Sequence, residues 1–134
     1  MLRSPRRGDI FWLGPDASRG SEPGVAHPHV VISDDVFNQS RVHTVVVCAL
    51  TSNLKRAEEP GNVLLESNEG QLPRQSVAVV SQVASVAKSE LGVYVGTLSQ
   101  ERVEQILAGL RFQQVSFFAR PGGSQRPGNS GSGK

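Results

Sequence analysis

The sequence predicts one mainly β domain with a C-terminal helix, arranged as a small barrel. Short β-branched apolar runs recur between Gly, Pro, Asn and Asp residues along the first two thirds of the chain, which is typical of a small sheet or barrel. One segment nearer the C-terminus instead carries apolar residues at helical spacing. A chain of 134 residues is long enough to bury one core unaided.

Five runs of the sequence are expected to form strands. They are DIFWL (9–13), HVVIS (29–33), VHTVVVCALT (42–51), NVLLE (62–66) and SVAVVSQVASV (76–86), the last of which should break near Gln82. The third run is almost continuously apolar, which indicates burial on both faces. Its Cys48 is the single cysteine of the chain, and we interpret it as a core residue in a reducing compartment.

The expected helix begins after Ser99, whose hydroxyl can cap it. Its apolar stripe, which should pack on the sheet, consists of Val103, Ile106, Leu107 and Leu110. Beyond the helix, Gly, Ser, Pro and Arg follow without periodicity. We therefore divide the chain into a basic N-terminal tail (1–7), a barrel domain (8–116) and a flexible tail (117–134).

The overall charge and the apolar runs limit the class of protein. The net charge is +2 and the isoelectric point about 9.1, which modestly favours an anionic partner. No apolar run approaches the roughly 18 residues that span a bilayer, and the basic N-terminus leads into no signal-peptide core. We expect a cytoplasmic protein that does not bind membranes.

Two histidines flank a proline in the stretch GVAHPHVV. Residues two apart on a strand share a face, so His27 and His29 should point the same way at the strand entry. Imidazoles titrate nearest neutral pH and suit acid–base catalysis. They could instead bind zinc with His43 as a third ligand, but no cysteine or carboxylate has diagnostic spacing. We expect no metal and no other cofactor. A double-histidine phosphoesterase would need two H-x-S/T motifs, which the sequence lacks.

Six segments resemble, in order and approximate spacing, the MazF/PemK toxins of type II toxin–antitoxin systems. The segments are RGDIFWL, RGSEPG, PHVVISDD, TSNL, SVAVVSQV and VGTLSQERV, and the likeness runs from about Arg7 to Val115. The resemblance implies an SH3-like barrel with an added helix and a homodimer. It also implies a metal-independent endoribonuclease that cuts single-stranded RNA at short sequences, and a cognate antitoxin that holds it inactive.

The chain departs from that family at the expected site. In the family an arginine precedes the proline of the second strand and acts with a threonine at the end of the third. Here His27 stands at the position of the arginine, and Thr51 matches the threonine, with Ser52 beside it. The family often has an arginine and an acidic residue in the segment QVASVAK, where Ala84 and Ala87 stand here. The site region has therefore lost at least two charged groups.

RNA cleavage without a metal needs a base, an acid and donors around the phosphate. We expect His27 as the base and Thr51 on the phosphate, with His29, Ser52 and Arg19 as further catalytic candidates. His29 would be the acid. Cationic or polar residues that could bind RNA are Arg19, Lys55, Arg56, Arg74, Ser81 and Gln82. Solvated surface charges and turn hydrogen bonds are the alternative roles of these residues.

Two other functions fit parts of the pattern. A non-enzymatic dimer could bind antitoxin or nucleic acid without cutting it. The gyrase-poison branch of the same fold acts through a Trp-containing C-terminal helix, whereas the only tryptophan here is Trp12. Because neighbours on a strand alternate faces, only one of Phe11 and Trp12 can point to the core, and we expect the other in a dimer contact.

Overall fold

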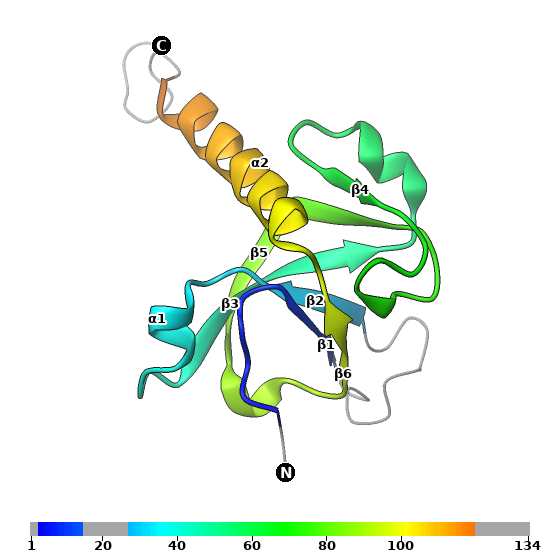
Figure 1. The fold of residues 1–134 in the computed structure, drawn as a ribbon. Coiled ribbons are helices and arrows are strands. Elements are labelled where there is room, and N and C mark those ends of the chain that lie inside the picture. Colours follow the sequence, from blue (N-terminus) through cyan, green and yellow to red (C-terminus); the bar gives the residue numbers. More distant parts are fainter. Residues whose placement is uncertain (1–2, 15–26, 120–134) are drawn as a thin grey trace.

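Six strands form one antiparallel sheet in the computed structural model, which describes residues 3–14 and 27–119 (Figure 1). Their order across the sheet is β4-β5-β3-β2-β1-β6. The strands are β1 (Asp9–Leu13), β2 (His27–Val31), β3 (Thr44–Thr51), β4 (Val63–Leu65), β5 (Ser76–Ala87) and β6 (Tyr94–Thr97). The mainly β fold with a C-terminal helix is therefore confirmed.

One long helix, α2 (Gln100–Ala119), lies against the sheet (Figure 1). Ser99 Oγ accepts a hydrogen bond from the Arg102 amide at 3.2 Å, so the expected cap is present. The helix extends past the expected domain limit at residue 116, because residues 117–119 are helical. The remaining helices are single turns: α1 (Asp35–Asn38), η1 (Leu54–Glu58), η2 (Glu69–Gln71) and η3 (Lys88–Glu90).

The two faces of the sheet bury different apolar clusters, as the alternation of a strand requires. On the helix face, Val103 and Ile106 of α2 pack with side chains that include Ile10, Val30 and Leu50. On the opposite face, which we call the far face, the cluster consists of Phe11, Val31, Val45 and Val47, with Leu13, Val86 and Leu91 against it. Of the neighbours Phe11 and Trp12, Phe11 is therefore the one that points to the core, and Trp12 is partly exposed.

Residues 3–7, which we assigned to a basic tail, are fixed to the sheet through the buried carboxylate of Asp9. Arg3 donates to both carboxylate oxygens, at 2.9 and 3.2 Å, and Thr97 on β6 donates at 2.8 Å. The guanidinium of Arg3 also lies 4.1 Å from the centroid of the Tyr94 ring. These bonds compensate the cost of burying a charge and join the N-terminal segment to β6.

Helix α2 touches the turn before β4 at two glycines. A Cβ atom on Gly61 would lie 2.9 Å from the carbonyl oxygen of Gly109, and one on Gly109 would overlap the carbonyl oxygen of Gly61. Gly61 also has a φ of +84°, which side chains disfavour. Helix α2 and the turn can therefore approach this closely only because both residues are glycines, which have no side chain.

Strand β5 continues to Ala87 instead of ending near Gln82, and the expected break takes the form of a bulge. Cys48 on β3 pairs with Val83 and its neighbour Ala49 pairs with Val79, so the three residues 80–82 have no partner on β3. The Val80 amide donates to Asn62 Oδ1 at 3.0 Å instead. Strand β6 was not expected, because a four-residue segment containing glycine has too weak a pattern.

Candidate active site

His27 and Thr51 lie at the same end of the sheet, where β2 begins and β3 ends. Strands β2 and β3 are antiparallel, with His29 opposite Ala49. The same register, continued by two residues, sets His27 opposite Thr51. Both residues have the side-chain parity of the far-face cluster, so they share that face. His27 is exposed and Thr51 partly exposed, so solvent reaches both members of the expected pair.

Pro28 ends the hydrogen bonding between β2 and β3 at this edge. The Ile32 amide donates to the Val46 carbonyl on β3 at 2.8 Å, so the even-numbered backbone nitrogens of this segment face β3. Pro28 has no N–H to donate. The pairing of β2 with β3 accordingly stops at His29, two residues short of His27 at the N-terminal end of β2. The strand ends that carry His27 and Thr51 are thus free of cross-strand bonds to each other.

The segment TSNL is a side-chain-stabilised turn that presents Thr51. Its Oγ1 accepts a hydrogen bond from the Asn53 amide at 3.1 Å. Asn53 Oδ1 in turn accepts from the Lys55 amide at 3.2 Å and caps η1. The Thr51 oxygen is therefore held in place while its hydroxyl proton remains able to donate to a ligand. Ser52 is exposed within the same turn.

His29 is half-buried, and its ring has a fixed orientation. Its Nδ1 lies 3.0 Å from the carbonyl oxygen of His27. A carbonyl oxygen can only accept, so Nδ1 carries the proton of this bond. Burial lowers the pKa of His29, and the nearby His27 lowers it further, against the opposing effect of the carbonyl bond. Burial thus favours the neutral imidazole, in which Nδ1 carries the proton and Nε2 the lone pair.

The candidate RNA-binding residues separate into three groups. Lys55 and Arg74 are exposed; Lys55 follows Thr51 on η1, and Arg74 precedes the start of β5 at the same edge of the sheet. Arg56 is already engaged, because it donates to both carboxylate oxygens of Glu59 at 2.9 and 3.1 Å and thereby holds the pKa of Glu59 below its usual value.

The third group lies away from Thr51, on the bulge of β5. Ser81 and Gln82 are exposed on the β5 bulge, next to Ala49 in the pairing and further along the sheet than Thr51. Arg19 lies outside the described residues. The structure thus places His27, Thr51, Ser52, Lys55 and Arg74 at one end of the sheet.

The described part of the chain offers no metal site. Among residues 3–14 and 27–119, no group of three or more His, Cys, Asp or Glu side chains could hold a metal ion. His43 precedes β3, whose eight residues span roughly 23 Å to the Thr51 end, so it cannot join His27 and His29. Cys48 is buried, and burial raises the pKa of its thiol to about 12, which makes it a core residue without nucleophilic reactivity.

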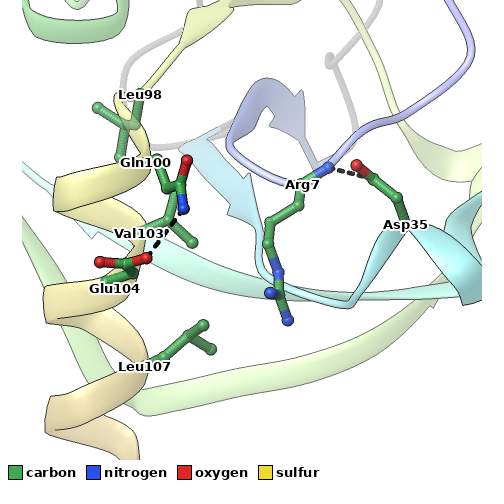
Figure 2. A pocket seen from close by; sticks show the side chains of 7 residues that line it. All are labelled: Arg7, Asp35, Leu98, Gln100, Val103, Glu104 and Leu107. Carbon is green, nitrogen blue, oxygen red and sulfur yellow. Dashed lines mark hydrogen bonds between the residues drawn. The ribbon is translucent and has the colours of Figure 1, made fainter.

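A cavity of about 270 Å³ lies on the helix face, between the first turns of α2 and the N-terminal segment (Figure 2). Leu98, Val103 and Leu107 form its apolar lining. The Arg7 amide donates to Asp35 at 2.7 Å, and Gln100 donates to Glu104 at 3.0 Å. None of the expected site residues lines this cavity, so the candidate active site is the exposed end of the sheet where β2 begins and β3 ends.

No helix within the described ranges is long and apolar enough to cross a membrane.

Several solved structures have a similar fold. An endoribonuclease in complex with its cognate antitoxin from mycobacterial species matches 82% of this chain and 94% of its own, with a TM-score of 0.65 and 21% identity. A MazE-MazF structure from Deinococcus radiodurans matches 84% of this chain and 97% of its own, with a TM-score of 0.65 and 17% identity. These likenesses define the fold class.

Sequence comparison identifies the family. Residues 6–113 match the family of the PemK-like, MazF-like toxins of type II toxin-antitoxin systems. Endoribonuclease MazF6 of Mycobacterium tuberculosis is 37% identical over 107 residues, which is 78% of this chain and 92% of the relative. Endoribonuclease MazF of Staphylococcus saprophyticus is 30% identical over 101 residues, or 75% of this chain and 83% of the relative. The chain belongs to this toxin family.

Proposed function

We propose that the chain is the toxin of a type II toxin–antitoxin system and cleaves single-stranded RNA without a metal ion. The observation that carries this proposal is that His27 and Thr51 lie on the exposed, unpaired ends of the neighbouring strands β2 and β3. The family membership and the endoribonuclease relatives support the substrate class. The protein acts in the cytoplasm, where messenger RNA is available.

The proposed reaction uses the 2′-hydroxyl of the RNA as the nucleophile. His27, as a neutral imidazole, takes the 2′-hydroxyl proton, and the 2′-oxygen attacks the adjacent phosphorus. The Thr51 hydroxyl donates to a non-bridging oxygen on which charge develops, with Ser52 as a second donor. The 5′-oxygen leaves and takes a proton from water. Lys55 and Arg74 hold the flanking phosphates.

Arginine and histidine provide different chemistry at the position before the proline. An arginine is a permanent cation and an awkward base, since its pKa exceeds about 12. A histidine is a better base but is cationic only when protonated. With His27 in place of the arginine, the site gains a group that can transfer protons and loses a permanent cation, so we expect weaker binding of RNA.

Partners follow from the same family membership. The mycobacterial endoribonuclease was solved with its cognate antitoxin, and the Deinococcus toxin with MazE. We propose that this chain likewise forms a homodimer and is held inactive by a cognate antitoxin. The partly exposed Trp12 is the residue that we place in the contact between the two copies.

A second candidate function is a dimer that binds antitoxin or nucleic acid without cutting RNA. The loss of the permanent charge at residue 27 and the engagement of Arg56 by Glu59 favour it. A binder of this kind needs neither the imidazole nor the Thr51 hydroxyl for its affinity.

Cleavage of a long natural RNA by purified protein, with EDTA present and at several pH values, tests the proposal. Wild type is compared with His27→Ala and Thr51→Ala, and with His43→Ala as the control, since His43 is exposed at the other end of β3. We expect wild type and the control to cut at a recurring short motif, and both site variants to lose at least 100-fold in rate, the typical contribution of general acid–base catalysis.

Three outcomes separate the candidates. Equal cleavage by wild type and His27→Ala would remove His27 from the mechanism. Intact RNA with all four proteins, each folded, would favour the non-cutting dimer. Cleavage that EDTA abolishes would refute the metal-free reaction.

A further inference from the structure

His29 is not used in the proposed reaction, although it lies beside the reacting pair. It has the same parity as His27 on β2, so the two side chains stand on the far face about 6.6 Å apart along the strand. Its cross-strand neighbours are Phe11 on β1 and Ala49 on β3, neither of which offers a polar side chain. A nucleotide next to the scissile bond would meet His29 before it meets any other polar group of this row.

The hydrogen bond to His27 determines what His29 presents. Because Nδ1–H donates to the His27 carbonyl at 3.0 Å, the neutral ring has its lone pair on Nε2. Nε2 lies on the part of the ring farthest from the backbone, and no described residue forms a hydrogen bond to it. The ring therefore offers one fixed acceptor, in a half-buried setting where a hydrogen bond discriminates more strongly than in water.

We propose that His29 selects the base next to the cleaved bond, accepting a hydrogen bond at Nε2 from the exocyclic amino group of adenine or cytosine. Guanine and uracil present a keto oxygen at the equivalent place, which cannot donate to this acceptor. RNA-binding proteins read unstacked bases through such edges and stack them on aromatic rings. This inference rests on the proposed RNA substrate and adds a specificity-determining residue to it.

Two substitutions separate base reading from support of the strand. His29→Asn keeps an amide donor near the position of Nδ1, so it can still bond to the His27 carbonyl, but it has no group at the place of Nε2. His29→Gln extends a polar amide group to the place of Nε2. We expect the asparagine variant to lose the base preference and the glutamine variant to retain part of it. His43→Ala serves as the control, and circular dichroism verifies that each variant is folded.

The readout does not depend on cleavage. A random RNA library, 2′-O-methylated so that it cannot be cut, is bound to each protein, and the bound fraction is sequenced. For wild type and His43→Ala we expect adenine and cytosine to be enriched roughly two- to tenfold at one position, the size of one neutral hydrogen bond. The enrichment should disappear in His29→Asn. Wild type without such an enrichment, or an enrichment that His29→Asn preserves, would overturn the proposal.

A change of pH gives an independent signature. When His29 is protonated, Nε2 becomes a donor, so the preference should move toward the keto bases guanine and uracil as the pH falls. Of the groups around His29, the neighbours Phe11 and Ala49 do not titrate, Tyr94 on β6 lies beyond Phe11, and His27 is the histidine on the same strand. The reversal should therefore persist in His27→Ala and vanish in His29→Asn. If wild type binds with this preference but cuts no RNA, the inference about His29 stands and the proposed nuclease activity fails.

Discussion

Replacement of Gly109 by alanine tests how helix α2 is held on the sheet. In an open helix this change stabilises a protein by up to about 1 kcal/mol, because alanine has the higher helix propensity. Here the added methyl group would overlap the backbone carbonyl oxygen of Gly61. Helix and turn must therefore separate, and overpacking of this kind costs about 1 to 3 kcal/mol. We expect the overpacking cost to exceed the propensity gain.

The assay is urea unfolding monitored by circular dichroism. It is repeated at several protein concentrations so that the effect of assembly on stability is separated from that of folding. The neighbouring Ala108 is exposed, so Ala108→Gly serves as a matched reverse change that should cost only about 0.5 to 1 kcal/mol. Because the glycine contact also positions the turn after η1, RNA binding through Lys55 should weaken in Gly109→Ala. A Gly109→Ala protein that is as stable as wild type, or more stable, would refute the close packing of helix and turn.

Three further predictions concern single side chains. His27→Arg introduces the arginine that the family resemblance places before Pro28; because a guanidinium is a permanent cation, binding of uncleavable RNA should tighten, and unchanged binding in a filter-binding assay would contradict the contact of residue 27 with phosphate. Arg102 lowers the pKa of Glu69 in the folded protein. Their ion pair therefore stabilises the folded state fully above the pKa that Glu69 has in the unfolded chain, and this stabilisation is lost as the pH falls through the lower pKa of the folded state. Glu69→Gln should flatten the dependence of the unfolding free energy on pH below about 5, and an unchanged slope would argue against the pair. Iodoacetamide should label Cys48 only after unfolding, because the thiol is buried with a pKa of about 12, and rapid labelling of the native protein, measured by mass spectrometry, would contradict its burial.

Local patterns located most of the elements. The run from Asp9 to Leu13 and the stripe led by Val103 formed a strand and a helix as expected, because burial of one face produces a period that is visible in the sequence. Strand β6 escaped prediction because its four residues form a strand only by pairing with β1. The bulge at residues 80–82 likewise depends on the register against β3, which no local pattern encodes.

The candidate site divides in the same way. His27 and Thr51 were selected from the sequence by residue type and by resemblance, and the antiparallel pairing of β2 with β3 places them at the same end of the sheet. Residue type alone could not show that Arg56 is engaged by Glu59. It also could not show that His29 is half-buried and bonded to the His27 carbonyl.

By itself the sequence determined which segments are strands and helix, where Pro28 must interrupt a ladder, and which side chains can transfer protons, because these are properties of residues and their near neighbours. Only the tertiary structure decided which of those side chains meet. His27 and Thr51 are far apart along the chain, and they share an edge because burial of Phe11, Val31 and Val47 on one face permits a single register between the strands. Proximity, ion pairing and pKa shifts all depend on that register, and therefore on the packing of the whole sheet.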